Sequence, residues 1–342
     1  MSAQAESHLA LPYPWQQSEW QRVLQLQAQQ KLPHALMLGG QKGLGKTHFA
    51  AAVAHYLLCL APQSGLACEN CRNCRLNQAQ THPDIHWVSP EETGKVIKVD
   101  QIRHLAEFVG KTSQQGGLKV AVIAPAEAMN VNAANALLKS LEEPSGDTLL
   151  LLVSHAPSAV LATIRSRCQQ LNFAVPDRQQ TLPWLKKLVG NADADALLDF
   201  AGNAPLVALA LLEGDALEQR STMLNDLQAL AEGRDSALGV ARRWMAFEPL
   251  TVVEWVLIWL HSGARVWVTG AANVELGAVF QHLHIPLVYR YIDKVMQLKR
   301  QLLSRANPNK QLLLEELLMD WSALTRHPSS EGSRQSMRNG LS

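Results

Sequence analysis

The clearest chemical pattern in the chain is a glycine-rich run from Gly40 to Thr47, which matches G-x-x-x-x-G-K-[ST]. The glycines of such a loop, Gly40, Gly43 and Gly45 here, let backbone N–H groups curl around phosphate oxygens. Lys46 is placed to reach the outer phosphates of a nucleoside triphosphate, and Thr47 to offer its hydroxyl to Mg²⁺. The run predicts a site for ATP and Mg²⁺; the alternative is a glycine-rich turn that binds nothing.

A second pattern is a group of four cysteines, Cys59, Cys68, Cys71 and Cys74, with the spacing C-x8-C-x2-C-x2-C. Four thiolates this close together suit the tetrahedral coordination of zinc, and a set with no open position indicates a structural ion. A redox C-x-x-C pair is the alternative, but it leaves the two other thiols unexplained. The fifth cysteine, Cys168, stands apart and is expected to be a small buried residue.

The groups that hydrolyse ATP are missing where that chemistry needs them. A second buried strand should end in an acidic residue for Mg²⁺, usually followed by a glutamate that activates water. The strand-like run in the right place, 119–123, ends in Ala124 and Pro125, neither of which binds a metal or accepts a proton. Glu127 lies beyond the strand end and is expected at a solvated position, with a role as substitute base as the alternative. The sequence therefore predicts phosphate binding without intrinsic ATPase activity.

Short apolar runs alternate with helical patterns around these residues, which is typical of a parallel α/β sheet covered by helices on both faces. An apolar run at 35–38 leads into the phosphate loop, and a helix is expected from 46 to 59. The other expected strands are 85–88, 119–123 and 148–154, and the other expected helices of this region are 15–30, 100–109, 132–142 and one around Val160.

The character of the chain changes after Phe173, where strand-like runs become scarce. We expect three domains and a tail: an α/β domain at 1–173, which includes the cysteine module at 59–74, a small helical domain at 174–213, a larger helical domain at 214–325, and a disordered tail at 326–342.

Composition excludes several classes of protein. The 342 residues carry 31 Lys and Arg against 30 Asp and Glu, a net charge of +1, which argues against a generally basic nucleic-acid-coating surface. Five cysteines are too few for a disulfide scaffold. The apolar stretch 250–268 contains Glu254, His261 and Arg265, and the N-terminus lacks the pattern of a signal peptide. A cytoplasmic protein without a membrane segment is expected.

Three more motifs occur together with these features: Asn-Ala-Leu-Leu-Lys-Ser-Leu-Glu-Glu-Pro at 135–144, Ser-Arg-Cys at 166–168, and Thr-His-Pro-Asp at 81–84. With the cysteine module, they make the chain resemble the bacterial clamp-loader subunits of DNA polymerase III, within the AAA+ class. The resemblance is strong over 10–173 and weaker over 174–325. It implies an AAA+ P-loop domain, then a helical lid domain and an all-helical collar domain.

The resemblance also implies a division of labour. In this family the gamma/tau subunits hydrolyse ATP, while another ring member keeps a degenerate site. Ala124 and Pro125 stand where gamma-like members carry Asp-Glu, and the run 202–205 lacks the sensor arginine of the second domain. Arg167 matches the family's arginine finger, which would project into the ATP site of a neighbouring gamma/tau subunit. From spacing alone, Arg167 would be an ordinary surface ion pair.

These expectations combine into a non-hydrolysing clamp-loader subunit, a component of the DNA polymerase III holoenzyme. Its partners would be the gamma/tau and delta subunits, with the sliding clamp and primed DNA engaged through the assembly. Two alternatives stay open: an active ATPase of the gamma/tau type, and a zinc-bearing binding module that never touches nucleotide.

Overall fold

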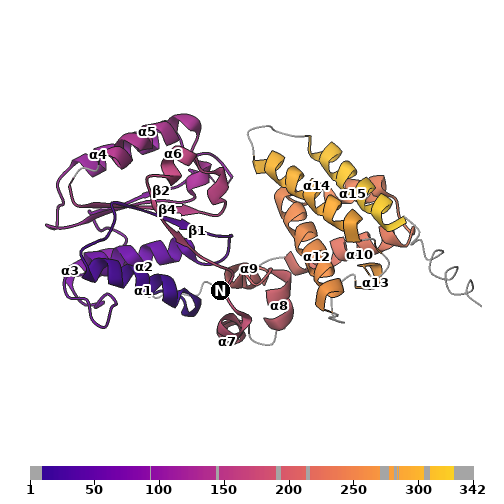
Figure 1. Ribbon diagram of the computed structural model, residues 1–342, viewed down its shortest axis with the longest axis horizontal. Coiled ribbons are helices and arrows are strands. Elements are labelled where there is room, and N and C mark those ends of the chain that lie inside the picture. Colours follow the sequence, from indigo (N-terminus) through magenta and orange to yellow (C-terminus); the bar gives the residue numbers. More distant parts are fainter. Residues whose placement is uncertain are drawn as a thin grey trace, which may run out of the picture. The chain divides into compact units, whose positions relative to one another are not determined.

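The computed structural model describes residues 10–92, 94–143, 146–189, 194–212, 216–269, 277–280, 283, 285–303 and 309–326. The chain divides into two compact units, Met1–Ala210 and Leu211–Ser342 (Figure 1). The expected tail at 326–342 lies, apart from its first residue, outside the described residues.

The first unit is built on a parallel sheet with the strand order β2-β3-β4-β1-β5. Every pairing between neighbouring strands is parallel, which confirms the predicted class of fold. The strands are β1 (Ala35–Gly39), β2 (Ile85–Val88), β3 (Lys119–Ile123), β4 (Thr148–Ser154) and β5 (Gln169–Asn172).

Helices cover both faces of this sheet because the buried strands are apolar on both sides. In β1, Leu36 and Leu38 pack toward one cluster, whereas Ala35 and Met37 pack toward the other. Figure 1 shows α1 and α2 on one face, and α4 and α5 on the other. The helices are α1 (Gln17–Ala28), α2 (Lys46–Leu58), α3 (Arg72–Gln78), α4 (Val99–Gly110), α5 (Val131–Glu142) and α6 (Ala162–Arg165), preceded by a 3-10 helix at Pro14–Gln16.

Three short helices complete the first unit: α7 (Arg178–Leu188), α8 (Ala194–Phe200) and α9 (Pro205–Ala210). They contact one another, and α7 also contacts the 3-10 helix near the N-terminus. The three-domain division of the chain stays a prediction, because these helices fall in the same compact unit as the sheet.

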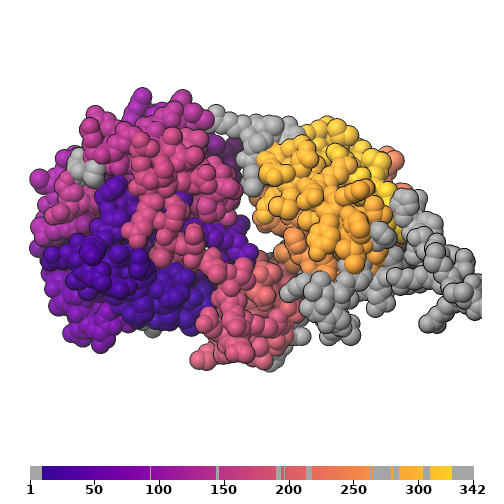
Figure 2. All heavy atoms as spheres, viewed as in Figure 1, coloured from indigo at the N-terminus to yellow at the C-terminus, as the bar shows by residue number. Residues whose placement is uncertain are grey.

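The second unit is helical within the described residues. Trp244 and Trp321 are among its largest buried side chains, and the indole N–H of Trp321 donates to the Leu227 carbonyl oxygen at 2.9 Å. Helices α14 and α15 contact each other and form one continuous orange and yellow surface in Figure 2. The helices are α10 (Ala216–Ala231), α11 (Ala237–Trp244), α12 (Pro249–Thr269), α13 (Gly277–Phe280), α14 (Ile285–Leu303) and α15 (Lys310–Arg326).

Helix α12 contains the apolar stretch 250–268 and buries Trp255 and Trp259. Among the described residues, no helix has the length and apolar character needed to cross a membrane.

The elements differ from the sequence prediction in three places. The helix expected around Val160 is instead a 3-10 turn at Pro157–Ala159, followed by the four-residue α6. Strand β5 and helix α3 carry few apolar residues, so hydrophobic periodicity does not reveal them.

Candidate functional site

The phosphate loop joins the carboxyl end of β1 to α2, as its sequence predicted. Gly43 and Gly45 have φ values of 84° and 79°, a region that favours glycine, and Lys46 is the first residue of α2. A backbone of this shape places successive N–H groups at a helix N-terminus, where anions bind favourably. The loop therefore has the backbone conformation that phosphate binding requires.

Lys46 is engaged inside the protein and does not face solvent. Its side chain is buried, and its Nζ donates to the Gln41 carbonyl oxygen of the same loop at 2.6 Å. Burial lowers the pKa of Lys46 to about 8, and the charge of Glu127 opposes this shift in part. Lys46 thus bonds to the backbone of its own loop, and it would have to give up this hydrogen bond to reach a phosphate.

An N-terminal segment lies directly on the loop. A Cβ atom added to Gly45 would come within 2.6 Å of the Tyr13 ring, so that ring packs against the loop backbone. The indole N–H of Trp15 and the side-chain amide of Gln16 both donate to the Leu44 carbonyl oxygen, at 3.1 and 2.8 Å. The segment is therefore fixed to the loop by packing and by two hydrogen bonds.

Aromatic rings continue this cover from the N-terminal segment to α7. Tyr13 stacks on Trp15 with 4.7 Å between ring centroids, and Trp184 of α7 meets both rings edge-on at 5.6 and 4.9 Å. The His48 ring lies 4.6 Å from Tyr13. We call these four residues the aromatic cap. It joins three segments of the chain around the start of α2.

The first turn of α9 also contacts the loop. The Leu206 N–H donates to the Gly43 carbonyl oxygen at 3.1 Å, and a Cβ on Gly43 would come within 2.4 Å of Val207. The run 202–205, where the sequence lacks a sensor arginine, leads into this helix. The helix contributes backbone and apolar contacts to the loop.

The two residues directly after β3 have no side chain that could bind a metal ion. Ala124 and Pro125 follow the strand, and the Ala124 N–H donates to the Val88 carbonyl oxygen at 2.9 Å. Glu127 is half-buried, with its Oε1 accepting from the His155 N–H at 2.8 Å, so the expected solvated position was wrong. This carboxylate holds the loop after β4.

Arg167 lies between α6 and β5 and is partly exposed. Its Nη2 lies 2.6 Å from Glu142 Oε1, and its Nη1 donates to the Thr163 carbonyl oxygen at 2.9 Å. The ion pair expected from spacing alone is therefore present. These two contacts use two of the five N–H donors of the guanidinium.

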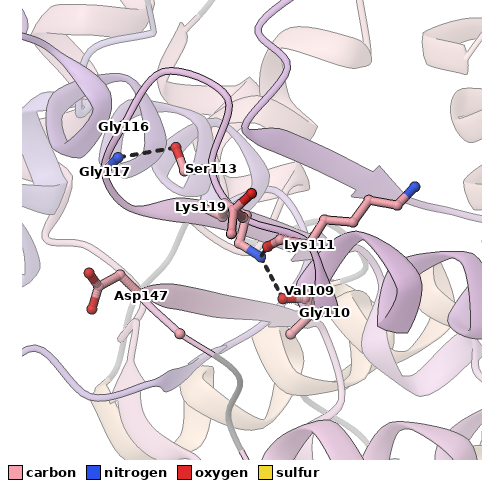
Figure 3. Close-up of a pocket in the computed structure, with 10 residues that line it drawn as sticks. Val109, Gly110, Lys111, Ser113, Gly116, Gly117, Lys119 and Asp147 are labelled. Carbon is pink, nitrogen blue, oxygen red and sulfur yellow. Dashed lines mark hydrogen bonds between the residues drawn. The ribbon is translucent and has the colours of Figure 1, made fainter.

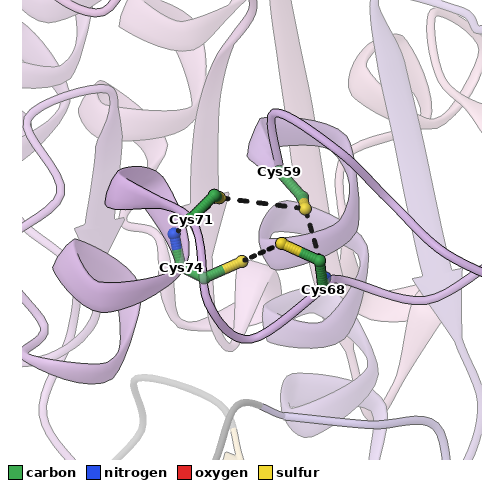
Figure 4. A group of neighbouring side chains, drawn as sticks. All are labelled: Cys59, Cys68, Cys71 and Cys74. Carbon is green, nitrogen blue, oxygen red and sulfur yellow. Dashed lines mark hydrogen bonds between the residues drawn. The ribbon is translucent and has the colours of Figure 1, made fainter.

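The four predicted cysteines meet in one place. Their Sγ atoms all lie within 4.8 Å of one another, and Figure 4 shows them converging from the end of α2, the following loop and α3. The Cys59–Cys71 and Cys68–Cys74 sulfur pairs are 4.0 and 3.9 Å apart. A tetrahedral ion with Zn–S bonds of about 2.3 Å places its sulfurs about 3.8 Å apart, so the donor set fits zinc.

Backbone groups already support negative charge on these sulfurs. The Cys68 N–H donates to Cys59 Sγ at 3.2 Å, and the Cys74 N–H to Cys71 Sγ at 3.4 Å. Hydrogen bonds from the Asn70 and Cys71 N–H groups lower the pKa of Cys68 to about 6, whereas burial raises the pKa of Cys74. The cluster can hold one cation. Cys168 is buried in the sheet core, away from it.

A hollow at the opposite edge of the sheet has a structural explanation (Figure 3). Lys119 begins β3, and its Nζ donates to three carbonyl oxygens at the C-terminal end of α4, those of Phe108, Val109 and Lys111. Such a lysine satisfies the free carbonyls of a helix end. This hollow lies at the amino ends of the strands and so is separate from the phosphate loop.

The acidic residue of the Thr-His-Pro-Asp motif fixes the rim of the same hollow. The Asp84 carboxylate accepts from Ser113 Oγ and from the N–H groups of Gln114 and Gln115, at 2.7 to 2.9 Å. His82 accepts the Asp84 N–H through its Nδ1 at 3.1 Å. This motif thus organises a loop and takes no part in the phosphate site.

Comparisons with known proteins agree with this arrangement. A family model described as "DNA polymerase III, delta subunit" matches residues 15–177, and one described as "DNA polymerase III, delta subunit, C terminal" matches 214–323. A Pseudomonas aeruginosa protein named DNA polymerase III subunit delta' is 40% identical over 323 residues, covering 91% of this chain and 98% of that protein. The chain belongs to the DNA polymerase III subunit delta' family.

Other similar proteins include the Escherichia coli member of the delta' family, which is 32% identical over 324 residues, covering 90% of this chain and 94% of that one. Among solved structures, a gamma-subunit-related protein from Thermotoga maritima covers 91% of this chain and 100% of its own at 16% identity, with a TM-score of 0.44. The delta' relatives do not favour the gamma/tau-like alternative.

Sequence reasoning located the phosphate loop and the cysteine cluster but missed the aromatic cap. The loop and the cluster are local patterns, whereas Trp184 reaches Tyr13 and Trp15 only through the fold. The one available signal was the density of large aromatic residues in Tyr13-Pro14-Trp15, directly before the first helix.

Proposed function

We propose that this chain is a non-hydrolysing subunit of the DNA polymerase III clamp loader. It assembles in a ring with gamma/tau and delta subunits in the cytoplasm and helps to load the sliding clamp onto primed DNA. The names of its delta' relatives support membership of the polymerase assembly. In this proposal residues 1–173 form the AAA+ domain, 174–213 the lid and 214–325 the collar.

One observation supports the lack of hydrolysis most directly. The phosphate loop has its glycine conformation, yet Ala124 and Pro125 occupy the strand end that would carry the Mg²⁺ ligand and the residue that activates water. Glu127, the nearest carboxylate along the chain, is hydrogen-bonded to the His155 backbone. ATP can therefore be held through Gly40, Gly43, Gly45, Lys46 and Thr47 but not turned over by this chain.

The contribution of the chain to catalysis, in this proposal, is Arg167. Its guanidinium enters the ATP site of a neighbouring gamma/tau subunit and stabilises the charge that develops on the transferred phosphoryl group. Partial exposure and a position just outside the sheet support this role. The four cysteines, Cys59, Cys68, Cys71 and Cys74, hold a structural zinc ion, which fixes the loop between α2 and α3.

The test compares the isolated chain with the reconstituted clamp loader. The isolated chain should show no ATP turnover, and a robust rate that Lys46→Ala abolishes would establish the gamma/tau-like alternative. In the assembled complex, Arg167→Ala should leave assembly intact and lower the ATPase rate stimulated by clamp and primed DNA. Arg22→Ala, at an exposed position of α1, is the matched control. Unchanged stimulation with Arg167→Ala would remove the finger assignment.

A further inference from the structure

The two contacts of Arg167 define how its guanidinium is held before any neighbour arrives. Nη2 is paired with Glu142 Oε1 at 2.6 Å, and Nη1 donates to the Thr163 carbonyl oxygen at 2.9 Å. Arginine has five N–H donors, so about three remain for a phosphate. Glu142 and Thr163 of its own subunit thus hold the guanidinium through Nη1 and Nη2, and among the described residues no other hydrogen bond or ion pair of this side chain is present.

Both partners of Arg167 come from firmly packed elements. Thr163 lies in α6 next to Ile164, and Glu142 follows Leu141 at the end of α5. Ile164 and Leu141 are buried in the same core cluster, and α5 contacts α6. The anchors of the arginine therefore have defined positions relative to the sheet.

Glu142 has no evident role in stabilising its own helix. It is the last residue of α5, where the helix dipole disfavours a negative charge. Both partners of the ion pair are partly exposed, and exposed pairs contribute little to stability. The carboxylate is thus placed for its effect on Arg167 more than for its effect on the fold.

We propose that Glu142 is a positioning residue for Arg167, which holds the guanidinium in the orientation that it presents to the phosphates of a neighbouring subunit. This inference rests on the finger role proposed for Arg167. A free arginine side chain samples many rotamers, and restraining it beforehand reduces the entropy lost when the subunits meet. Glu142 itself touches neither nucleotide nor reacting atoms.

The experiment uses the reconstituted clamp loader with clamp and primed DNA. Glu142→Gln preserves the shape of the side chain and an acceptor oxygen but removes its charge. We expect the stimulated kcat to fall about three- to tenfold, with KM for ATP unchanged, because misorientation affects the transition state more than binding. Glu142→Asp should restore part of the rate, since it keeps the charge on a shorter side chain.

Matched controls separate positioning from folding. Glu143→Gln changes the next residue, which is also an exposed glutamate, and should leave the rate unchanged. The thermal midpoint of the free subunit should be the same for the wild type, Glu142→Gln and Glu143→Gln. A midpoint lowered by Glu142→Gln alone, in parallel with the rate, would assign Glu142 a structural role and overturn the inference.

The double variant Glu142→Gln with Arg167→Ala tests whether Glu142 acts through Arg167. If Glu142 acts only through Arg167, then Glu142→Gln combined with Arg167→Ala has the rate of Arg167→Ala alone. Two results would overturn the positioning role of Glu142 and leave the finger role of Arg167 intact. One is a double variant with a lower rate than Arg167→Ala alone; the other is a Glu142→Gln complex with a rate equal to or above that of the wild type. A normal rate with Arg167→Ala would instead remove the finger assignment on which this inference rests.

Discussion

Removal of Tyr13 from the aromatic cap should open the phosphate loop to nucleotide. The Tyr13 ring packs on Gly45, beside the buried Lys46, and contacts three other rings, those of Trp15, His48 and Trp184. We expect a nucleotide that enters this loop to displace the ring. Tyr13→Ala removes the obstacle beforehand, so we expect this variant to bind ATP more tightly than the wild type.

The size of the effect follows from the ring contacts. Each aromatic pair contributes about 0.5–1.5 kcal/mol beyond the area that it buries, so three pairs resist displacement of Tyr13 by about 3 kcal/mol. Since about 1.4 kcal/mol corresponds to a tenfold change in affinity, the cap weakens apparent ATP binding about 100-fold. The dissociation constant of Tyr13→Ala should be lower by a factor of this order.

Equilibrium dialysis with labelled ATP and Mg²⁺ measures this directly on the isolated full chain. Tyr289→Ala, at an exposed position of α14, is the matched control and should bind as the wild type does. Adding Lys46→Ala to Tyr13→Ala should abolish the gained affinity, which ties that affinity to the phosphate loop. Equal affinity of Tyr13→Ala and wild type would refute the cap as an obstacle, and weaker binding would show that the ring supports the nucleotide. An absence of binding in every variant would instead support a module that never touches nucleotide.

Two other predictions concern the same unit. Because burial lowers the pKa of Lys46 to about 8, its ammonium is mostly charged at pH 7 and mostly neutral at pH 9. ATP binding by the wild type, which keeps this burial, should therefore weaken as pH rises through 8, and a midpoint near 10.5 would contradict the lowered pKa. Lys42→Met changes an exposed lysine and should leave the midpoint in place. Metal analysis should find about one zinc per chain, and chelation or Cys71→Ser should lower the thermal midpoint, whereas Cys168→Ala should keep the metal. A metal-free chain as stable as the native one would rule out a structural ion.

The parts of this protein that were predictable are those in which neighbouring residues specify the outcome. Glycines between an apolar run and a helical pattern indicate the loop that leads to Lys46, because backbone freedom and periodicity are local properties. The cysteine spacing is equally local, and the four thiols do meet within 4.8 Å. The sequence alone did not specify the order of the strands, β2-β3-β4-β1-β5.

The remaining features depend on contacts between distant segments. Trp184 joins the aromatic cap only because α7 packs against the N-terminal 3-10 helix. Glu127 is half-buried because the loop after β4 supplies a backbone N–H to its carboxylate. Strand β5 is short and polar, so its pairing with β1, and not its own composition, makes it a strand.

The pairing of β5 with β1 also determines where Arg167 emerges from the protein. Gln169 lies opposite Leu36 and Asn172 opposite Gly39, so the strand that begins two residues after the arginine is aligned with the strand that enters the phosphate loop. A slip of one residue would move the start of β5 by about 3.3 Å and turn its side chains to the opposite face. Insertions or deletions between α6 and β5 should therefore be tolerated far less well than substitutions there, because chain length in this connection sets the reach of the guanidinium.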